Sequence, residues 1–117
     1  MHPKTPKLLD DIGQAAAFIR EVTAGRTIDE YRVDRLFRSA VERNFEIIGE
    51  AVNRLARVDP ASASRIGEYA RIIAFRNVLI HGYDLIEDGQ VWNVVQQELP
   101  LLHDTITALL REVNPAP

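Results

Sequence analysis

The stretch FRNVLIHGYD, residues 75–84, holds the side chains of this chain that are best suited to chemistry. Arg76 and Asn77 come first, His81 follows five positions after the Arg, and Tyr83 comes two positions later. A guanidinium can bind a phosphate group through paired hydrogen bonds. Histidine is the side chain whose unperturbed pKa suits proton transfer near neutral pH. Together these residue types could act on a phosphodiester.

Each of these side chains also has a structural explanation. Arg76 lies among apolar residues, where it must reach solvent or pair with a carboxylate such as Glu46 or Glu50. His81 can interact favourably with the dipole at the C-terminal end of a helix. The ring of Tyr83 can cover the end of a helical bundle. In this composition about 0.3 Arg–His pairs at this spacing are expected by chance. The whole set of polar residues, and not the pair, therefore points to a site.

The spacing of the two ionisable residues favours a site shared between two chains. Five helical steps place His81 about 140° around the helix from Arg76, so the two do not face each other squarely. Cleavage of RNA by its own 2′-hydroxyl needs a base and an acid, and one chain offers one suitable His. A symmetric dimer would bring two Arg76 and two His81 into one cleft. The Arg would stabilise the charge on the phosphate, and no metal or other cofactor is required.

Other kinds of chemistry find little support in the sequence. The chain has no Cys, which excludes disulfides and thiolate metal sites. Its Asp and Glu residues lack the spacing of a metal site, and it has no glycine-rich phosphate loop, GxSxG elbow or helix-turn-helix signature. The net charge of −3 argues against bulk coating of nucleic acid and leaves room for a small basic cleft.

The first elements that position the motif are predicted to be helical. A helix is expected over residues 6–24, with Thr5 as its N-cap and Gly25 after its end. Thr27 and Glu30 predict a capping box at the start of the next helical segment. No convincing strand pattern or hairpin turn interrupts this reading.

A long helix is predicted over residues 29–58, with a possible break near Arg32. Gly49 lies in its middle, where glycine costs about 1 kcal/mol relative to Ala and often lets another backbone approach. Residues 59–64 break the apolar pattern and restart a helix, with Pro60 near its first turn.

The motif itself lies at the end of the next predicted helix. This helix is expected from Ser64 to residue 80 or 81, and Gly82 can end it. Asp84 or Asp88 is a candidate N-cap for a last helix over residues 89–113. Pro100 should kink that helix or split it in two.

These elements predict an all-α fold, an antiparallel bundle of four to five helices. A single domain over residues 1–117 is expected, with frayed ends at residues 1–5 and 114–117. Charge interrupts the first apolar run, unlike in a signal peptide, and no run approaches the roughly 20 apolar residues of a membrane span. A cytoplasmic protein is therefore expected.

The motif resembles a known family. RNVLIHGYD, residues 76–84, resembles the R-x4-H-x-Y motif of HepT-like proteins, a branch of the HEPN superfamily. Two further stretches agree, AVERNFEIIGEAVNRL at residues 40–55 and VWNVVQQELPLLHDTI at residues 91–106. The resemblance extends over about residues 6–110. It implies a helical bundle that dimerises and, for many members, a metal-independent endoribonuclease toxin of a type VII toxin–antitoxin pair.

The resemblance also implies roles for individual residues. The family's catalytic Arg and His match Arg76 and His81, and Asn77 matches the polar residue that orients the site. The implied partner is MntA, a minimal nucleotidyltransferase that acts as antitoxin by transferring AMP to the motif Tyr, here Tyr83. Such an AMP would add negative charge and bulk at the mouth of the cleft, which would repel and block RNA.

Three functional hypotheses follow. The first is a homodimeric ribonuclease toxin that is inhibited by modification of Tyr83. The second is a subunit of a nucleotidyltransferase complex that binds nucleotide or substrate without cutting RNA. The third is an interaction bundle whose polar motif is structural. The complete motif favours the first hypothesis over the third, whereas the second stays open.

Overall fold

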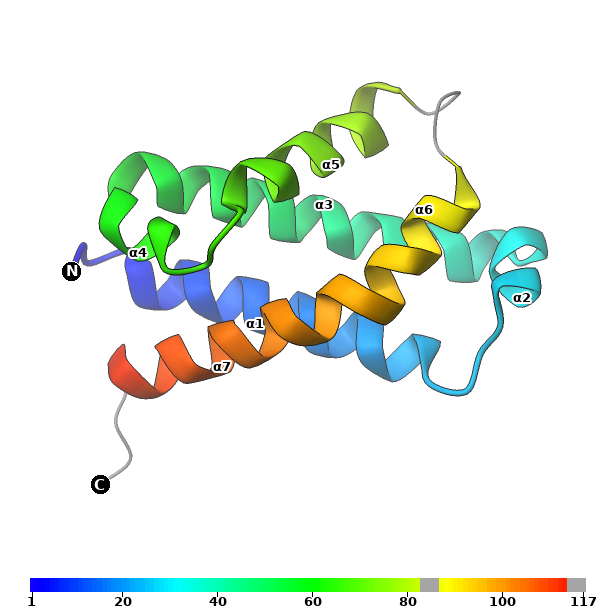
Figure 1. Ribbon diagram of the computed structural model, residues 1–117, viewed down its shortest axis with the longest axis horizontal. Coiled ribbons are helices and arrows are strands. Elements are labelled where there is room, and N and C mark those ends of the chain that lie inside the picture. The colour runs from blue at the N-terminus through cyan, green and yellow to red at the C-terminus, as the bar shows by residue number, and fades with distance from the viewer. Residues whose placement is uncertain (83–86, 114–117) are drawn as a thin grey trace.

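The computed structural model describes residues 1–82 and 87–113, and within these ranges every regular element is helical (Figure 1). The all-α prediction is therefore confirmed. The elements in chain order are α1 (Thr5–Thr23), α2 (Ile28–Val33), α3 (Arg35–Val58), α4 (Pro60–Ser64), α5 (Tyr69–His81), α6 (Asp88–Asn93), the π-helix η2 (Val94–Glu98) and α7 (Leu99–Val113).

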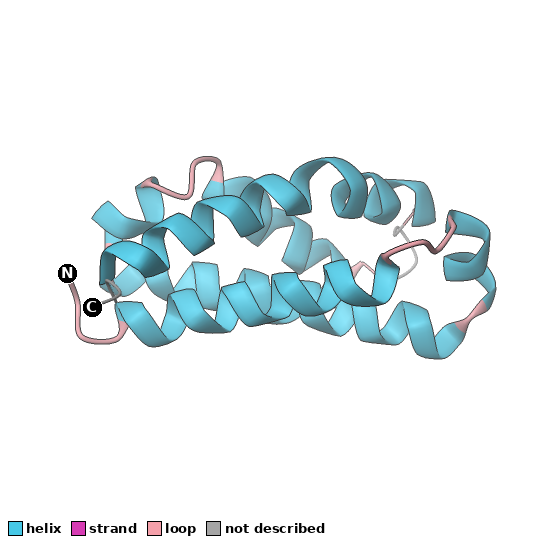
Figure 2. Ribbon diagram, turned by 90° about the horizontal axis from the view of Figure 1, so that it is seen from below, coloured by secondary structure: helices cyan, strands magenta, loops and turns pink. Residues whose placement is uncertain are grey.

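The long helices form a bundle in which α1 packs against both α3 and α7 (Figure 1). Figure 2 shows the same bundle from below, with short loops joining the helices. The core lies between α1, α3 and α7, and its fully buried side chains include Leu9, Ile12, Ile19, Val41, Ile48, Val52, Leu55, Leu99 and Ile106. Helix α5, which carries the motif, packs mainly on α3 at the edge of this core.

The joint between α2 and α3 confirms two predictions. Thr27 and Glu30 form the predicted capping box at the start of α2. The predicted break near Arg32 occurs at Asp34, which ends α2 and caps α3 by accepting a hydrogen bond from the backbone N–H of Phe37 at 3.0 Å. An Asp side chain satisfies a free N–H group at a helix start, so the chain can turn here without losing that bond.

The predicted cap of α1 is wrong. Lys4 is the N-cap residue and makes no cap with its side chain, whereas Thr5 lies inside the helix. The Thr5 hydroxyl instead donates a 2.7 Å hydrogen bond to Asp59, which is buried and also accepts hydrogen bonds from the backbone and hydroxyl of Ser62. A buried carboxylate needs several donors, and Thr5 is one of them. Fraying of residues 1–5 and a single domain over the whole chain stay predictions, and residues 114–117 lie outside the described ranges.

The helix with the motif begins later than predicted, at Tyr69 instead of Ser64. Gly67 has a φ of +90° and therefore interrupts the helical path between α4 and α5. Glycine adopts positive φ without steric cost, so this position can turn the chain. The end of α5 agrees with the sequence, because Gly82 follows its last residue, His81.

The last helical rod also differs from the sequence in detail. Its N-cap residue is Glu87, and Asp88, predicted as a cap, lies in the first turn and pairs with Arg38 at 3.2 Å. Asp84, the other candidate, lies outside the described residues. The regular α-helix changes to a π-helical turn immediately before the Leu99–Pro100 segment. Proline lacks an N–H and crowds the preceding turn, and a wider turn accommodates it while the chain stays helical.

No helix in the described part of the chain is both long enough and apolar enough to cross a membrane.

Candidate functional site

Arg76 lies where α5 crosses α3 at Gly49. A Cβ atom added to Gly49 would overlap the Cβ and Cγ atoms of Arg76. The stem of the Arg side chain therefore rests directly on the α3 backbone, and only glycine leaves room for it. The sequence predicted the approach of another backbone at this glycine, and the structure instead places the side-chain stem of Arg76 there.

The guanidinium of Arg76 is held by two acceptors. Its Nη2 donates to Oε2 of Glu50 at 2.6 Å, and its Nη1 donates to Oδ1 of the neighbouring Asn77 at 2.9 Å. Of the two candidate carboxylates, Glu50 is therefore the partner, whereas Glu46 pairs with Arg43 at 3.4 Å. The Nε of Arg76 is buried and has no hydrogen-bond partner among the described residues. Two of the five N–H donors of a guanidinium are thus used and the Nε–H is buried, so one N–H on each terminal nitrogen remains for a ligand.

Glu50 is shared between two guanidinium groups. Its Oε1 accepts a hydrogen bond from Nε of Arg54 at 2.9 Å, while its Oε2 accepts from Arg76. The bond from Arg54 and then the charge of Arg76 lower the pKa of the Glu50 carboxyl, against an opposing effect of desolvation. Glu50 is therefore ionised at neutral pH, and the trio keeps one net positive charge.

A cleft of about 410 Å³ surrounds this trio, between α1, α3 and α5. Its charged lining residues are Asp11, Arg43, Glu46, Glu50, Arg54 and Arg76, and its apolar ones are Leu8, Ile47, Ala51 and Ile80. Three cations and three carboxylates balance each other, so the cleft is not strongly basic. This balance agrees with the acidic composition of the chain.

His81 lies apart from this cleft. It is the last residue of α5, it is exposed, and it is absent from the lining of the Arg76 cleft. Asn77 lies between the two around the helix and is also exposed. The described part of one chain therefore does not bring Arg76 and His81 into one cavity, as the helical spacing predicted. Tyr83 lies outside the described residues.

Sequence reasoning missed Arg54 as part of the site. The available signal was its position four residues after Glu50 on the same helix, a spacing at which a carboxylate and a guanidinium meet. The sequence contains many such pairs, and only the arrival of Arg76 from α5 makes this one part of a site.

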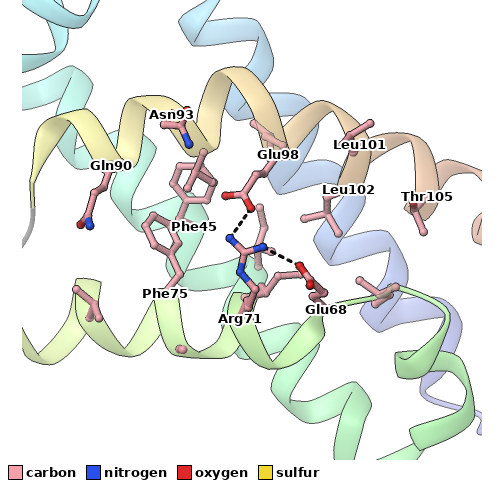
Figure 3. Close-up of a pocket in the computed structure, with 17 residues that line it drawn as sticks. Phe45, Glu68, Arg71, Phe75, Gln90, Asn93, Glu98, Leu101, Leu102 and Thr105 are labelled. Atoms are coloured by element: carbon pink, nitrogen blue, oxygen red, sulfur yellow. Dashed lines mark hydrogen bonds and ion pairs between the residues drawn. The ribbon is translucent and has the colours of Figure 1, made fainter.

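A second and larger cavity, about 620 Å³, lies on the other side of α5, facing η2 and α7 (Figure 3). Its floor includes Phe45 and Phe75, whose rings meet edge to face with centroids 5.2 Å apart. Arg71 of α5 bridges the carboxylates of Glu68 at 2.7 Å and of Glu98 on η2 at 2.9 Å. The sequence gave no indication of this groove, because residues from distant segments form it.

The exposure of α5 is unusual for its composition. The helix YARIIAFRNVLIH is apolar around most of its circumference, yet Leu79 is its only buried residue in the structure described. Val78 and Ile80 keep 42% and 38% of their surface exposed. A helix that is apolar all round is normally covered on all sides. One side of α5 therefore lacks a neighbour among residues 1–82 and 87–113.

An all-α bundle with Arg76, Asn77 and His81 on one helix defines a HEPN-like protein. The chain belongs to the HepT-like ribonuclease family, because the sequence model of the family described as "Ribonuclease HepT-like" matches residues 12–109. The chain is 34% identical to "Probable ribonuclease HepT" of Thermococcus cleftensis, over 80% of this chain and 84% of that protein. It is 29% identical to "Putative RNase TTE0752" of Caldanaerobacter subterraneus subsp. tengcongensis, over 93% of this chain and 97% of that protein.

A longer relative also matches the chain. The chain is 28% identical, over 91% of its length, to "Gamma-glutamylcyclotransferase and putative RNase MJ0434" of Methanocaldococcus jannaschii. It spans 47% of that protein, about half of its length. No solved structure gives a significant match.

Proposed function

We propose that this chain is a metal-independent endoribonuclease that works as a homodimer, with a composite site of Arg76 and His81. The observation that carries the proposal is the placement of Arg76, a cation fixed on the α3 backbone with one unused N–H on each terminal nitrogen, on the helix that ends in an exposed His81. Membership of the HepT-like ribonuclease family supports this reading.

The proposed reaction is a transesterification within RNA. The 2′-oxygen attacks the adjacent phosphorus while a base takes its proton, and the bond between phosphorus and the 5′-oxygen breaks as an acid protonates that oxygen. The products are a 2′,3′-cyclic phosphate and a free 5′-hydroxyl. His81 of each protomer would serve in proton transfer, and Arg76 would stabilise the negative charge that grows on the phosphate oxygens. Asn77, bonded to Arg76, would help to orient the guanidinium.

The proposed dimer answers two features of the single chain. Among the described residues His81 does not line the cleft of Arg76, and a second copy would complete the pair. The uncovered apolar side of α5 lies beside both residues, and a second copy seated there would bury it. A symmetric dimer then places two His81 side chains near one axis, which supplies both the base and the acid.

We further propose that the chain is the toxin of a type VII toxin–antitoxin pair and that a MntA-like nucleotidyltransferase neutralises it. The phenolic oxygen of Tyr83 would attack the α-phosphorus of ATP, and pyrophosphate would leave, so that AMP becomes attached to the ring. Tyr83 follows His81 by two residues, and the added phosphate charge would oppose the binding of RNA there.

A second candidate function is a nucleotide- or substrate-binding subunit of a nucleotidyltransferase complex. The charge balance of the Arg76 cleft favours it, because three carboxylates beside three Arg weaken the attraction for a polyanion. In this case Arg76 binds a phosphate but no bond is cleaved.

The test is RNA cleavage by the purified protein in excess EDTA, after intact mass has shown that Tyr83 carries no AMP. Wild type and an Arg111→Ala control, in which an exposed Arg far from the motif in sequence is removed, should cut and leave 2′,3′-cyclic phosphate ends. Arg76→Ala and His81→Ala should retain the fold by circular dichroism and lose cleavage. Failure of unmodified wild type to cut several RNAs would favour the binding subunit.

A further inference from the structure

We propose that Glu50 is a positioning residue for the phosphate-binding Arg76 and that Arg54 holds Glu50 in place. This inference rests on the proposed ribonuclease function for its kinetic consequence, but the positioning itself is independent of that function. Glu50 does not need to touch RNA in this role. It acts on the reaction through the guanidinium that it fixes.

The geometry gives Arg76 little freedom once Glu50 is in place. The side-chain stem of Arg76 packs directly on Gly49. Glu50, the next residue of α3, accepts a hydrogen bond from Nη2 of Arg76 at 2.6 Å. Oδ1 of Asn77 accepts a second hydrogen bond, from Nη1 of Arg76, at 2.9 Å. Three consecutive constraints, on the stem and on both terminal nitrogens, therefore define where the remaining N–H donors lie.

Arg54 completes this arrangement by engaging the oxygen of Glu50 that Arg76 does not use. Its Nε donates to Oε1 at 2.9 Å, so both carboxylate oxygens are bound and the carboxylate cannot rotate without losing a bond. A side chain of Glu without a second partner would swing about three rotatable bonds. A catalytic group must be held close to its productive position, because a displacement of about 1 Å can reduce the rate on the order of 100-fold.

The carboxylate also has an electrostatic cost that makes the role testable. Glu50 places a negative charge next to the Arg that would bind the phosphate, and this charge weakens the attraction for RNA. If Glu50 only balanced charge, its neutralisation would lower KM and leave kcat unchanged. If it positions Arg76, its neutralisation must lower kcat even though the cleft becomes more positive.

The kinetic test compares Glu50→Gln with wild type on one RNA substrate. Glu50 is 36% exposed, and Gln has the same shape, so the variant should fold, with a modestly lower Tm because the ion pairs with Arg54 and Arg76 are lost. We expect kcat to fall on the order of 100-fold while KM stays the same or falls. An unchanged kcat, or a raised KM with the wild-type kcat, would overturn the proposal.

Two further variants separate positioning from a general loss of charge or of fold. Glu112→Gln removes the carboxylate of another ion pair between distant segments, with Arg65 at 2.7 Å, and should leave both constants unchanged. Arg54→Gln keeps the bond between Glu50 and Arg76 but removes the ion pair at Oε1 of Glu50. The kcat should therefore fall by less than in Glu50→Gln. If Glu50→Gln does not fold, wild-type kcat in Arg54→Gln would still count against the role of Arg54.

A measurement without RNA tests the positioning directly. The buried Nε–H of Arg76 should give a slowly exchanging ¹⁵N signal in NMR, which is assigned by its absence from Arg76→Lys. This signal should disappear through fast exchange in Glu50→Gln and persist in Glu46→Gln, since Glu46 pairs with Arg43. Persistence in Glu50→Gln would overturn the inference. If wild type cuts no RNA but these signals behave as expected, the proposed function fails and the positioning stands.

Discussion

Gly49 shows how much a single residue can decide at the point where two helices cross. Alanine would place a Cβ atom inside the stem of Arg76, and α3 or α5 would have to shift. We expect Gly49→Ala to cost about 1–3 kcal/mol of unfolding free energy, as overpacking does, despite the better helix propensity of Ala. Urea denaturation at neutral pH measures this cost, and RNA cleavage should be lost with it.

Gly89 is the matched control for this substitution. It also lies in a helix, α6, but a Cβ atom there would meet nothing within 4 Å. Gly89→Ala should therefore gain up to about 1 kcal/mol of stability from helix propensity alone. Equal changes in the free energy of unfolding for the two substitutions would show that the close packing of Arg76 on Gly49 does not affect stability.

The residues of the candidate site were partly predictable. The charged face of the long helix offers Glu46 and Glu50 as candidate partners of Arg76. The two are four residues apart, so the pattern cannot choose between them. The choice depends on where α5 crosses α3, a property of the folded chain that the spacing along one helix does not contain.

At the scale of the elements, helix positions follow from the apolar period, whereas some helix ends depend on distant residues. The break at Asp34 and the capping box of α2 are local signals, and both are confirmed. Thr5 has the local sequence of a cap, but its hydroxyl donates a hydrogen bond to Asp59, 54 residues away. The late start of α5 depends on the positive φ of Gly67, a backbone conformation that composition alone does not specify.

Asp59 connects the starts of α1 and α4, and its ionisation should set the acid stability of this end of the bundle. Hydrogen bonds from Thr5 first, and then from Ser62, hold the pKa of Asp59 well below its ordinary value. A lowered folded-state pKa contributes stability above the unfolded pKa of about 3.9, and this contribution is lost as the pH falls toward the folded pKa.

Asp59→Asn should therefore be less stable than wild type at pH 7, because a neutral amide accepts these hydrogen bonds more weakly. The difference between the two proteins should shrink as the pH falls below about 4. Urea denaturation at pH 7 and pH 3 measures both differences. A constant difference across this range would show that the charge of Asp59 does not stabilise the helix starts.

For the whole molecule, the decisive question is what covers α5. This helix carries apolar side chains that the described part of one chain leaves exposed, and it carries the site residues of the proposed reaction as well. A second copy on this side would explain both its composition and the separation of Arg76 from His81. The same association would link stability of the dimer to activity, because the proposed site takes residues from both protomers.

We therefore expect Val78→Glu to convert a dimer into a folded monomer without ribonuclease activity. Val78 is 42% exposed in the single chain, so a Glu there leaves the bundle intact, but burial of its charge in an interface is costly. Sedimentation velocity at micromolar concentration measures the mass, and RNA cleavage measures the activity. Val33→Glu, which changes an 85% exposed Val at the end of α2, is the control and should stay dimeric and active. A Val78→Glu protein that remains a dimer would place the interface elsewhere, and an active monomer would show that one chain suffices for catalysis.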